Sequence, residues 1–188
     1  MQEYCLENLG NNALGEIGEV LANNVLPYTH RTKGKTPDFL NQNFFFEIPE
    51  QFKLFLSKKW LSLDLFRFIL DAEGKKCTNI ELFEVKTSRK RYRYHFWDRQ
   101  IITKHSLEIY EEAKNQGVLV TLVEIQLMES WKFRVQTSSL FDNNFSISSR
   151  EHYNIRKKKA LFSEKSTPST SGIFFQKSQV NAQGRKRE

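Results

Sequence analysis

The chain has 188 residues, of which 39% are hydrophobic and 16 are phenylalanine, enough for one sizeable core. Lysine and arginine outnumber aspartate and glutamate by 29 to 22, and the net charge of +7 favours a polyanionic partner such as nucleic acid or an anionic membrane surface. The sequence has no apolar run of about eighteen residues and no secretory signal pattern at its start, so we expect no membrane span and an intracellular, cytoplasmic protein. Its two cysteines and four histidines lack ligand spacing, which argues against a zinc site.

The N-terminal residues predict a helix followed by a connection. In the stretch NNALGEIGEVLANNVLP, apolar residues recur every three or four positions from Leu14 to Val25 and make one apolar helical face. Pro27 ends this helix. Residues 28–37 are polar and cationic, and we expect them to form a connection without regular structure.

Two hairpins separated by a short helix are predicted next. The first hairpin covers 38–48 and turns at its Asn-Gln-Asn segment. Residues 49–60 carry apolar side chains at intervals of three and four, which predicts an inserted helix. A second, stronger hairpin joins Leu63–Leu70 to Ile80–Thr87 through a turn about Gly74.

A basic loop, a second long helix and two strands follow. The pattern predicts the helix from a cap at Asp98 to a terminating Gly117. The apolar run VLVTLVEIQL predicts a strand over 118–127, and WKFRV predicts a shorter one over 131–135. These elements indicate an α/β protein with a central sheet covered by helices.

The composition changes near residue 140, and three regions are predicted. Residues 1–140 form the α/β domain, 141–162 a basic C-terminal extension, and 163–188 a disordered tail rich in Ser, Thr and Lys. The tail contains one apolar triplet, Ile173–Phe175, which is either a docking motif for a protein partner or an incidental apolar cluster.

The candidate chemistry lies in the strand that leads into the basic loop. The pattern Glu-x-Lys occurs three times, and the copies at 73–75 and 112–114 fall in a turn and on a helix surface. Only Glu84 and Lys86 lie in a strand with apolar neighbours. Residues two apart in a strand share one face, so this carboxylate and this ammonium project side by side. The alternative interpretation is a surface ion pair worth under about 1 kcal/mol.

The predicted hairpin places a second carboxylate opposite the first. A hairpin folded about Gly74 pairs residues whose numbers sum to about 148, which sets Asp64 across from Glu84. Two carboxylates this close raise each other's pKa unless a cation lies between them. We therefore expect Mg²⁺, with Mn²⁺ as a substitute, held by Asp64, Glu84 and the Val85 carbonyl. Lys86 would orient the attacking water or help to deprotonate it.

The stretch FEVKT, with this order of elements, resembles the PD-(D/E)XK nuclease superfamily, which includes restriction endonucleases and archaeal Holliday-junction resolvases. The resemblance implies a restriction-endonuclease-like core in the order αβββαβ, a mixed central β-sheet flanked by helices, over residues 13–136. It implies that Glu84 and Lys86 are the motif acid and lysine. Its resolvase branch implies a further metal-binding acid on the first helix, Glu19 in GEIGE.

Three site assignments are open or depend on the resemblance. Glu16 is the weaker candidate for the acid on the first helix, and Gln100 falls where several branches have a polar residue near the site. The family's proline-aspartate pair occurs literally at Asp38, which is the alternative to Asp64. Asp64 follows Leu63 instead of a proline, but it belongs to the complete hairpin.

The basic loop predicts contact with DNA phosphates. Its cations alternate with aromatic residues that would stack on bases or anchor the loop in the core. A solvated loop is the alternative interpretation. The candidate phosphate ligands are Arg89, Lys90, Arg91 and Arg93.

The expected function is a Mg²⁺-dependent deoxyribonuclease that acts on DNA as a homodimer, with branched Holliday-junction DNA as a candidate substrate. Two alternatives stay open from the residues. One is a noncatalytic nucleic-acid-binding module that keeps the nuclease fold. The other is an assembly factor whose tail segment at 173–175 binds a protein.

Overall fold

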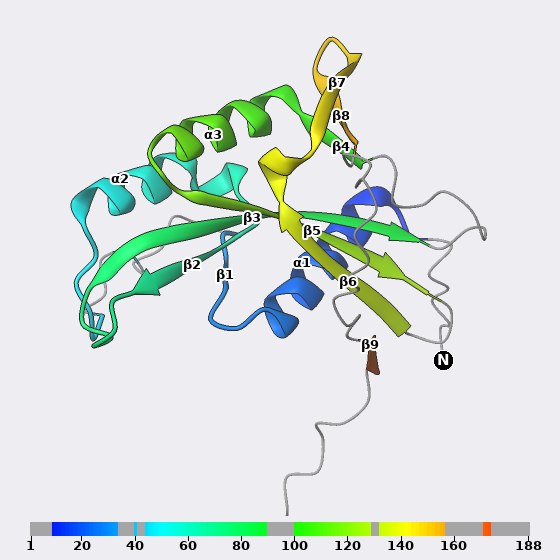
Figure 1. The fold of residues 1–188 in the computed structure, drawn as a ribbon. Helices are drawn as coiled ribbons and strands as arrows, with labels where there is room; N and C mark the ends of the chain where they lie inside the picture. The colour runs from blue at the N-terminus through cyan, green and yellow to red at the C-terminus, as the bar shows by residue number, and fades with distance from the viewer. Residues whose placement is uncertain are drawn as a thin grey trace, which may run out of the picture.

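The computed structural model describes residues 9–33, 40, 44–89, 100–128, 132–156 and 171–173. These residues form a mixed α/β fold whose central sheet is flanked by helices (Figure 1). The central sheet has six strands in the order β1-β2-β3-β5-β6-β9. Their bounds are His30–Arg31 for β1, Leu65–Leu70 for β2, Cys77–Arg89 for β3, Leu119–Leu127 for β5, Lys132–Ser139 for β6 and Ser171–Ile173 for β9.

The sheet is mixed because only β3 and β5 run parallel to each other. A parallel pair needs a crossover connection, and helix α3 (Lys104–Asn115) lies in the one between them. Helices α2 (Glu50–Lys59) and α3 cover one face of the sheet, and α1 (Asn11–Val25) covers the other (Figure 1).

Alternate strand residues supply two cores, one on each face. The α1 side is packed with Leu14, Leu21, Leu65, Phe83, Val85, Val123 and Ile125. The α2 and α3 side is packed with Phe52, Leu56, Phe66, Ile80, Leu82, Tyr110 and Leu122. The middle of β3 and most of β5 are therefore buried on both faces, which the almost unbroken apolar run of β5 predicts.

The second hairpin has the predicted register. Leu65 pairs with Phe83 and Phe68 with Ile80, so the paired numbers sum to 148, and one irregularity occurs between Ile69 and Leu70. Gly74 in the turn has a φ of 70°, a left-handed conformation that glycine adopts without strain. This confirms the strand pairing from which the position of Asp64 was predicted.

The first predicted hairpin is wrong in the part that the structure describes. Phe44 and Phe46 are not in a strand; their rings pack against Phe68, with centroids 5.6 and 5.3 Å away. Glu47 makes only an isolated bridge to Lys76. The strand next to β2 is instead β1, in the segment expected to be an irregular connection. In the described part of this segment, the phenylalanine rings pack against Phe68, and the residues that carry them form no hydrogen-bonded ladder.

The second long helix begins later than predicted. Residues Gln100–Thr103 form strand β4, and the cap of α3 is Thr103, whose Oγ1 accepts a hydrogen bond from the Ser106 N–H at 3.0 Å. Asp98, the predicted cap, lies outside the described residues. The chain from 100 to 103 is extended because it pairs with β8 (His152–Arg156), a partner that local periodicity cannot reveal.

The segment predicted as a basic extension contributes to a second sheet. Its strands are β4, β8 and β7 (Asn144–Ser149), joined in that order. Leu140 and Ile155 are buried with the α3-side core. In the predicted tail, Ser171–Ile173 pairs with β6, whereas Phe174 and Phe175 lie outside the described residues. No helix in the described part of the chain is long and apolar enough to cross a membrane.

Helix α1 comes close to β3 at Gly18. A Cβ atom built on Gly18 would lie 1.6 Å from Thr87 Oγ1, whereas one on Gly15 would meet no atom within 4 Å. We expect Gly18→Ala to lower the free energy of unfolding by about 1–3 kcal/mol through overpacking. The matched change Gly15→Ala should raise it by about 0.5–1 kcal/mol, because alanine favours a helix. Urea denaturation measures both, and equal effects would contradict this packing.

Candidate active site

Strand β3 carries the two residues on which the candidate site is built. Glu84 is only 4% exposed. Its neighbours Phe83 and Val85 belong to the α1-side core, so Glu84 and Lys86 project from the face that α3 covers. Their alternation with apolar residues thus places a carboxylate and an ammonium together beneath a helix.

Both oxygens of the Glu84 carboxylate have partners. Oε1 forms an ion pair with the Lys86 ammonium. Oε2 accepts a hydrogen bond of 2.7 Å from the hydroxyl of Tyr110, which is fully buried in α3. A buried charge is tolerated when it is paired and hydrogen-bonded, and these two contacts meet that requirement.

Asp64 lies directly before β2, where the hairpin register sets it across from Glu84. Its Oδ2 accepts a hydrogen bond of 2.7 Å from the Val85 N–H. Its main-chain carbonyl accepts one from the Thr32 N–H at 3.3 Å. The side chain of Asp64 thus takes the place of a strand partner for β3 at the point where β2 has not yet begun.

The Val85 carbonyl faces the same side of β3 as its N–H, because the two groups of one residue point to one neighbour in an antiparallel ladder. The hydrogen bond to Asp64 therefore shows that this carbonyl is directed towards the Asp64 side of the strand. The Asp64 carboxylate and this main-chain oxygen therefore lie along the same edge of β3.

The carboxyl of Asp64 is strongly perturbed. Burial, followed by the negative charge of Glu84, raises its pKa from 3.8 to about 8, although the Val85 N–H and Lys86 act in the opposite direction. A protein normally removes such a repulsion with a proton or a cation. The Asp64 and Glu84 carboxylates therefore interact electrostatically.

Lys86 keeps its proton at neutral pH. Burial alone would lower its pKa, but the charge and hydrogen bond of Glu84 and the charge of Asp64 outweigh burial and raise it. A lysine with a raised pKa donates hydrogen bonds and does not accept a proton. The orienting role predicted for Lys86 thus fits these surroundings better than a role in deprotonation.

Glu19 points from α1 towards two cations. Its Oε2 lies 3.2 Å from the guanidinium of Arg31 and 3.2 Å from the Lys33 ammonium. The negative charge of Glu19 also contributes to the raised pKa of Asp64. Glu16 is more exposed and lies 3.7 Å from Arg31. The helix acid expected near the site is thus near Asp64, and it is bound by cations.

Several predicted residues lie outside the described part of the chain, or only their backbone is described. Asp38, the alternative to Asp64, lies outside it, as do Lys90, Arg91 and Arg93. The guanidinium of Arg89 donates to the Leu9 carbonyl before α1. Gln100 begins β4 and not a helix.

Sequence reasoning missed two residues on this face of the sheet. The sequence does not indicate a role for Tyr110, because a tyrosine at helical spacing among apolar residues predicts only core packing. Glu124 is 1% exposed in β5 and lies in register with Lys86 on the adjacent strand. Glu124 could have been found from the sequence, because VEIQL places an acid and a glutamine at alternate positions of an apolar strand.

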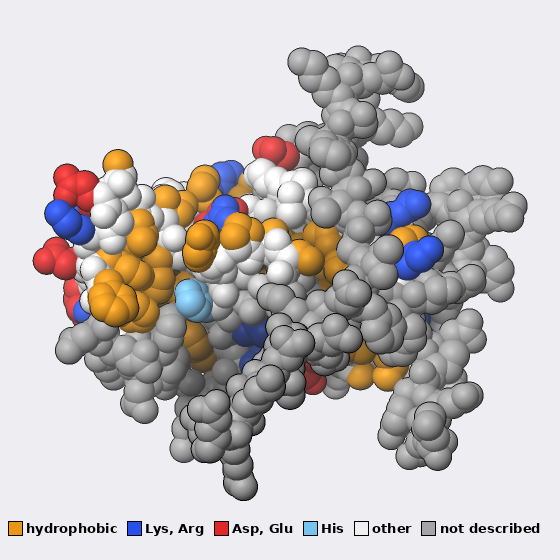
Figure 2. All heavy atoms as spheres, turned by 90° about the horizontal axis from the view of Figure 1, so that it is seen from below, with side chains coloured by type: hydrophobic (Ala, Val, Ile, Leu, Met, Phe, Trp, Pro, Cys, Tyr) orange, Lys and Arg blue, Asp and Glu red, His pale blue; other side chains and the backbone are white. Residues whose placement is uncertain are grey.

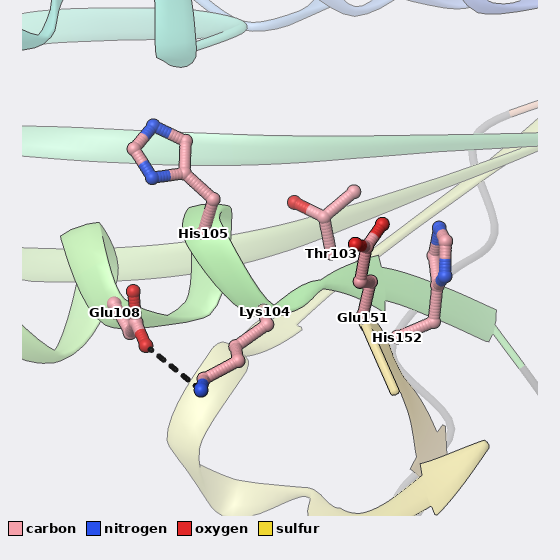
Figure 3. Close-up of a pocket in the computed structure, with 6 residues that line it drawn as sticks. All are labelled: Thr103, Lys104, His105, Glu108, Glu151 and His152. Atoms are coloured by element: carbon pink, nitrogen blue, oxygen red, sulfur yellow. Dashed lines mark ion pairs between the residues drawn. The ribbon is translucent and has the colours of Figure 1, made fainter. Parts of the chain in front are cut away.

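Two surface hollows lie elsewhere. One of about 320 Å³ is lined by residues of β4, α3 and the β7–β8 hairpin; in Figure 3, His105 and His152 project in different directions and Glu108 pairs with Lys104 at 3.8 Å. The other, of about 560 Å³, is lined mainly by apolar residues of β2 and its neighbours. Figure 2 shows hydrophobic side chains gathered over the β2–β3 end of the molecule. Neither hollow is lined by Asp64, Glu84 or Lys86.

The donor set at Asp64 fits a magnesium ion. Among the residues that the structure describes, no three acidic, histidine or cysteine side chains converge on one point. Mg²⁺ is usually held by one or two carboxylates and keeps several waters, whereas zinc requires more protein ligands. Asp64, Glu84 and the Val85 carbonyl supply the number and kind of oxygen ligands that Mg²⁺ uses.

Comparisons of this chain with protein-family models, with curated proteins and with solved structures found no match in any of the three.

Proposed function

We propose that the chain is a Mg²⁺-dependent endonuclease that hydrolyses phosphodiester bonds in DNA. The proposal rests on three side chains, one directly before β2 and two on the adjacent β3. Glu84 pairs with Lys86, and Asp64 accepts a hydrogen bond from the Val85 N–H between them. Burial, followed by the negative charge of Glu84, raises the Asp64 pKa to about 8, and a hard divalent cation would relieve the repulsion between the two carboxylates.

The order of elements supports a restriction-endonuclease-like fold. The chain runs through α1, the antiparallel strands β1, β2 and β3, then α3, and β5 parallel to β3. This order matches the αβββαβ arrangement that the resemblance implied, with α2 and β4 as additions. In the αβββαβ arrangement, the acid and the lysine of FEVKT lie on the third strand, which is β3.

In this proposal, the acidic residues hold the cation and the lysine acts on the water or the phosphate. Asp64, Glu84 and the Val85 carbonyl would hold the cation, with Glu19 as a further acid nearby. The cation would supply Lewis-acid activation of water and stabilisation of charge at phosphorus. Lys86, kept as an ammonium by Glu84, donates hydrogen bonds to the attacking water or to a phosphate oxygen.

Net charge favours a polyanionic substrate, a class that includes DNA. The chain carries +7, and the cations after β3 follow directly on the strand that holds Glu84. We propose phosphate contacts for Arg89, Lys90, Arg91 and Arg93, and a polar contact for Gln100. A homodimer would present two such sites to a four-way junction, which makes branched DNA part of the proposal.

Cleavage assays test the proposed function. With Mg²⁺ or Mn²⁺, the purified chain should nick supercoiled plasmid or cut a four-way junction, and EDTA should abolish the products while leaving DNA binding in place. Binding that is salt-dependent but yields no product with either metal would favour the noncatalytic nucleic-acid-binding module instead. A chain that neither binds nor cuts DNA would exclude both functions.

A further inference from the structure

We infer that Tyr110 is a positioning residue for the cation site, with its hydroxyl fixing the orientation of the Glu84 carboxylate. The inference rests on the proposed function and extends it to a residue on α3. The observation that carries it is the hydrogen bond of 2.7 Å from the Tyr110 hydroxyl to Glu84 Oε2.

Tyr110 is the one polar side chain among the buried residues of α3. The other buried residues of α3 are Leu107, Ile109 and Ala113. The Tyr110 side chain is 0% exposed, so its hydroxyl has no access to bulk water. A buried hydroxyl costs free energy unless it is hydrogen-bonded, and phenylalanine would fill the same space without that cost. The hydroxyl of Tyr110 is directed at one acceptor, the acid of the candidate site.

The two partners of Glu84 fix its carboxylate from different elements. Lys86 is bound to Oε1 from the same strand, and Tyr110 to Oε2 from the helix above the sheet. A carboxylate has about four lone-pair sites, so these contacts leave others free for a cation. Removing the helix contact would leave the side chain free to rotate about its last bond. The orientation of the proposed ligand would then no longer be fixed before the cation binds.

Helix α3 is well suited to this task. It lies in the crossover between β3 and β5, the two strands that run in parallel beneath it. Its capped start and its buried residues fix the helix relative to the strand that bears Glu84. Hydrogen-bond partners that orient metal ligands from a second layer typically contribute about 10- to 100-fold to metal affinity or activity.

The test compares Tyr110→Phe with the wild type in two measurements. Isothermal titration calorimetry measures Mn²⁺ binding, and a cleavage assay measures activity. We expect the Mn²⁺ dissociation constant to rise by about 10- to 100-fold and the Mn²⁺ dependence of cleavage to shift by the same factor. The matched control is Tyr153→Phe, the same chemical change at a partly buried tyrosine of β8. This control should bind Mn²⁺ as the wild type does.

The wild-type chain provides a second measurement that does not depend on the stability of the variant. With tyrosine labelled at Cζ, the carbon resonance of Tyr110 should shift when Mg²⁺ is added, because its hydrogen-bond acceptor becomes a cation ligand. If Tyr110→Phe bound Mn²⁺ with unchanged affinity, the inference would be overturned and the proposed function would stand. The same would follow if the chain bound Mg²⁺ but the Tyr110 resonance did not shift. A wild-type chain that binds no divalent cation would overturn the proposed function as well.

Discussion

Replacing Lys86 with glutamine is expected to lower the rate of DNA cleavage by about 10²–10³-fold. The amide can still donate a hydrogen bond to Glu84, but the positive charge next to the proposed reaction centre is lost. Because that charge would stabilise the transition state more than the bound substrate, the loss should fall on kcat and leave DNA affinity nearly unchanged. Single-turnover cleavage and a parallel binding titration separate the two quantities.

The chain offers a matched control for this change at Lys75. It belongs to another Glu-x-Lys copy, and its ammonium lies 2.9 Å from Glu73, but this pair is 77% and 71% exposed in a turn. We expect Lys75→Gln to cleave DNA at the wild-type rate. If Lys86→Gln cleaved as fast as Lys75→Gln, Glu84 and Lys86 would be a structural ion pair and the catalytic role would be lost.

Replacing Asp64 with asparagine is expected to stabilise the fold at pH 8 while it abolishes cleavage. The pKa of Asp64 is raised from 3.8 to about 8 by burial and by Glu84. The folded state therefore holds a proton that the unfolded state releases above pH 4. The stability that Asp64 contributes is present below about pH 4 and is lost as the pH rises to about 8. Asparagine is neutral throughout, so it avoids this loss.

Thermal melts at several pH values measure this effect. The gain of Asp64→Asn over the wild type should be near zero at pH 4 and on the order of 10 °C at pH 8. Adding Mg²⁺ at pH 8 should raise the melting temperature of the wild type, because it replaces the proton, and leave that of the variant unchanged. The exposed Asp142 gives the control Asp142→Asn. A gain independent of pH would show that the pKa of Asp64 is not raised in the folded state.

The central part of the site could be predicted because it depends on short-range rules. Period-two alternation put Glu84 and Lys86 on one face, and one turn glycine set the pairing register that brought Asp64 close to them. These rules use only neighbouring residues and the geometry of one hairpin.

The missed features depend on partners that are distant in the chain. Strand β1 has two residues, too few to show a period, and is extended only because it pairs with β2. Strand β4 pairs with β8, about fifty residues later in the chain. Local periodicity cannot show that pairing, and it therefore predicts that these residues belong to the helix that follows. Tyr110 meets Glu84 only once α3 has crossed over the sheet. Such contacts are set by tertiary packing, which overrides local preference.

The most direct test of the proposed cation site is the anomalous diffraction of manganese in a crystal of the wild-type chain. We predict one Mn²⁺ peak at about 2.1 Å from carboxylate oxygens of both Asp64 and Glu84, with the Val85 carbonyl among its ligands. A manganese ion bound by Asp38 in place of Asp64 would contradict the assignment of the aspartate. A crystal with saturating Mn²⁺ and no peak at Glu84 would contradict the account as a whole.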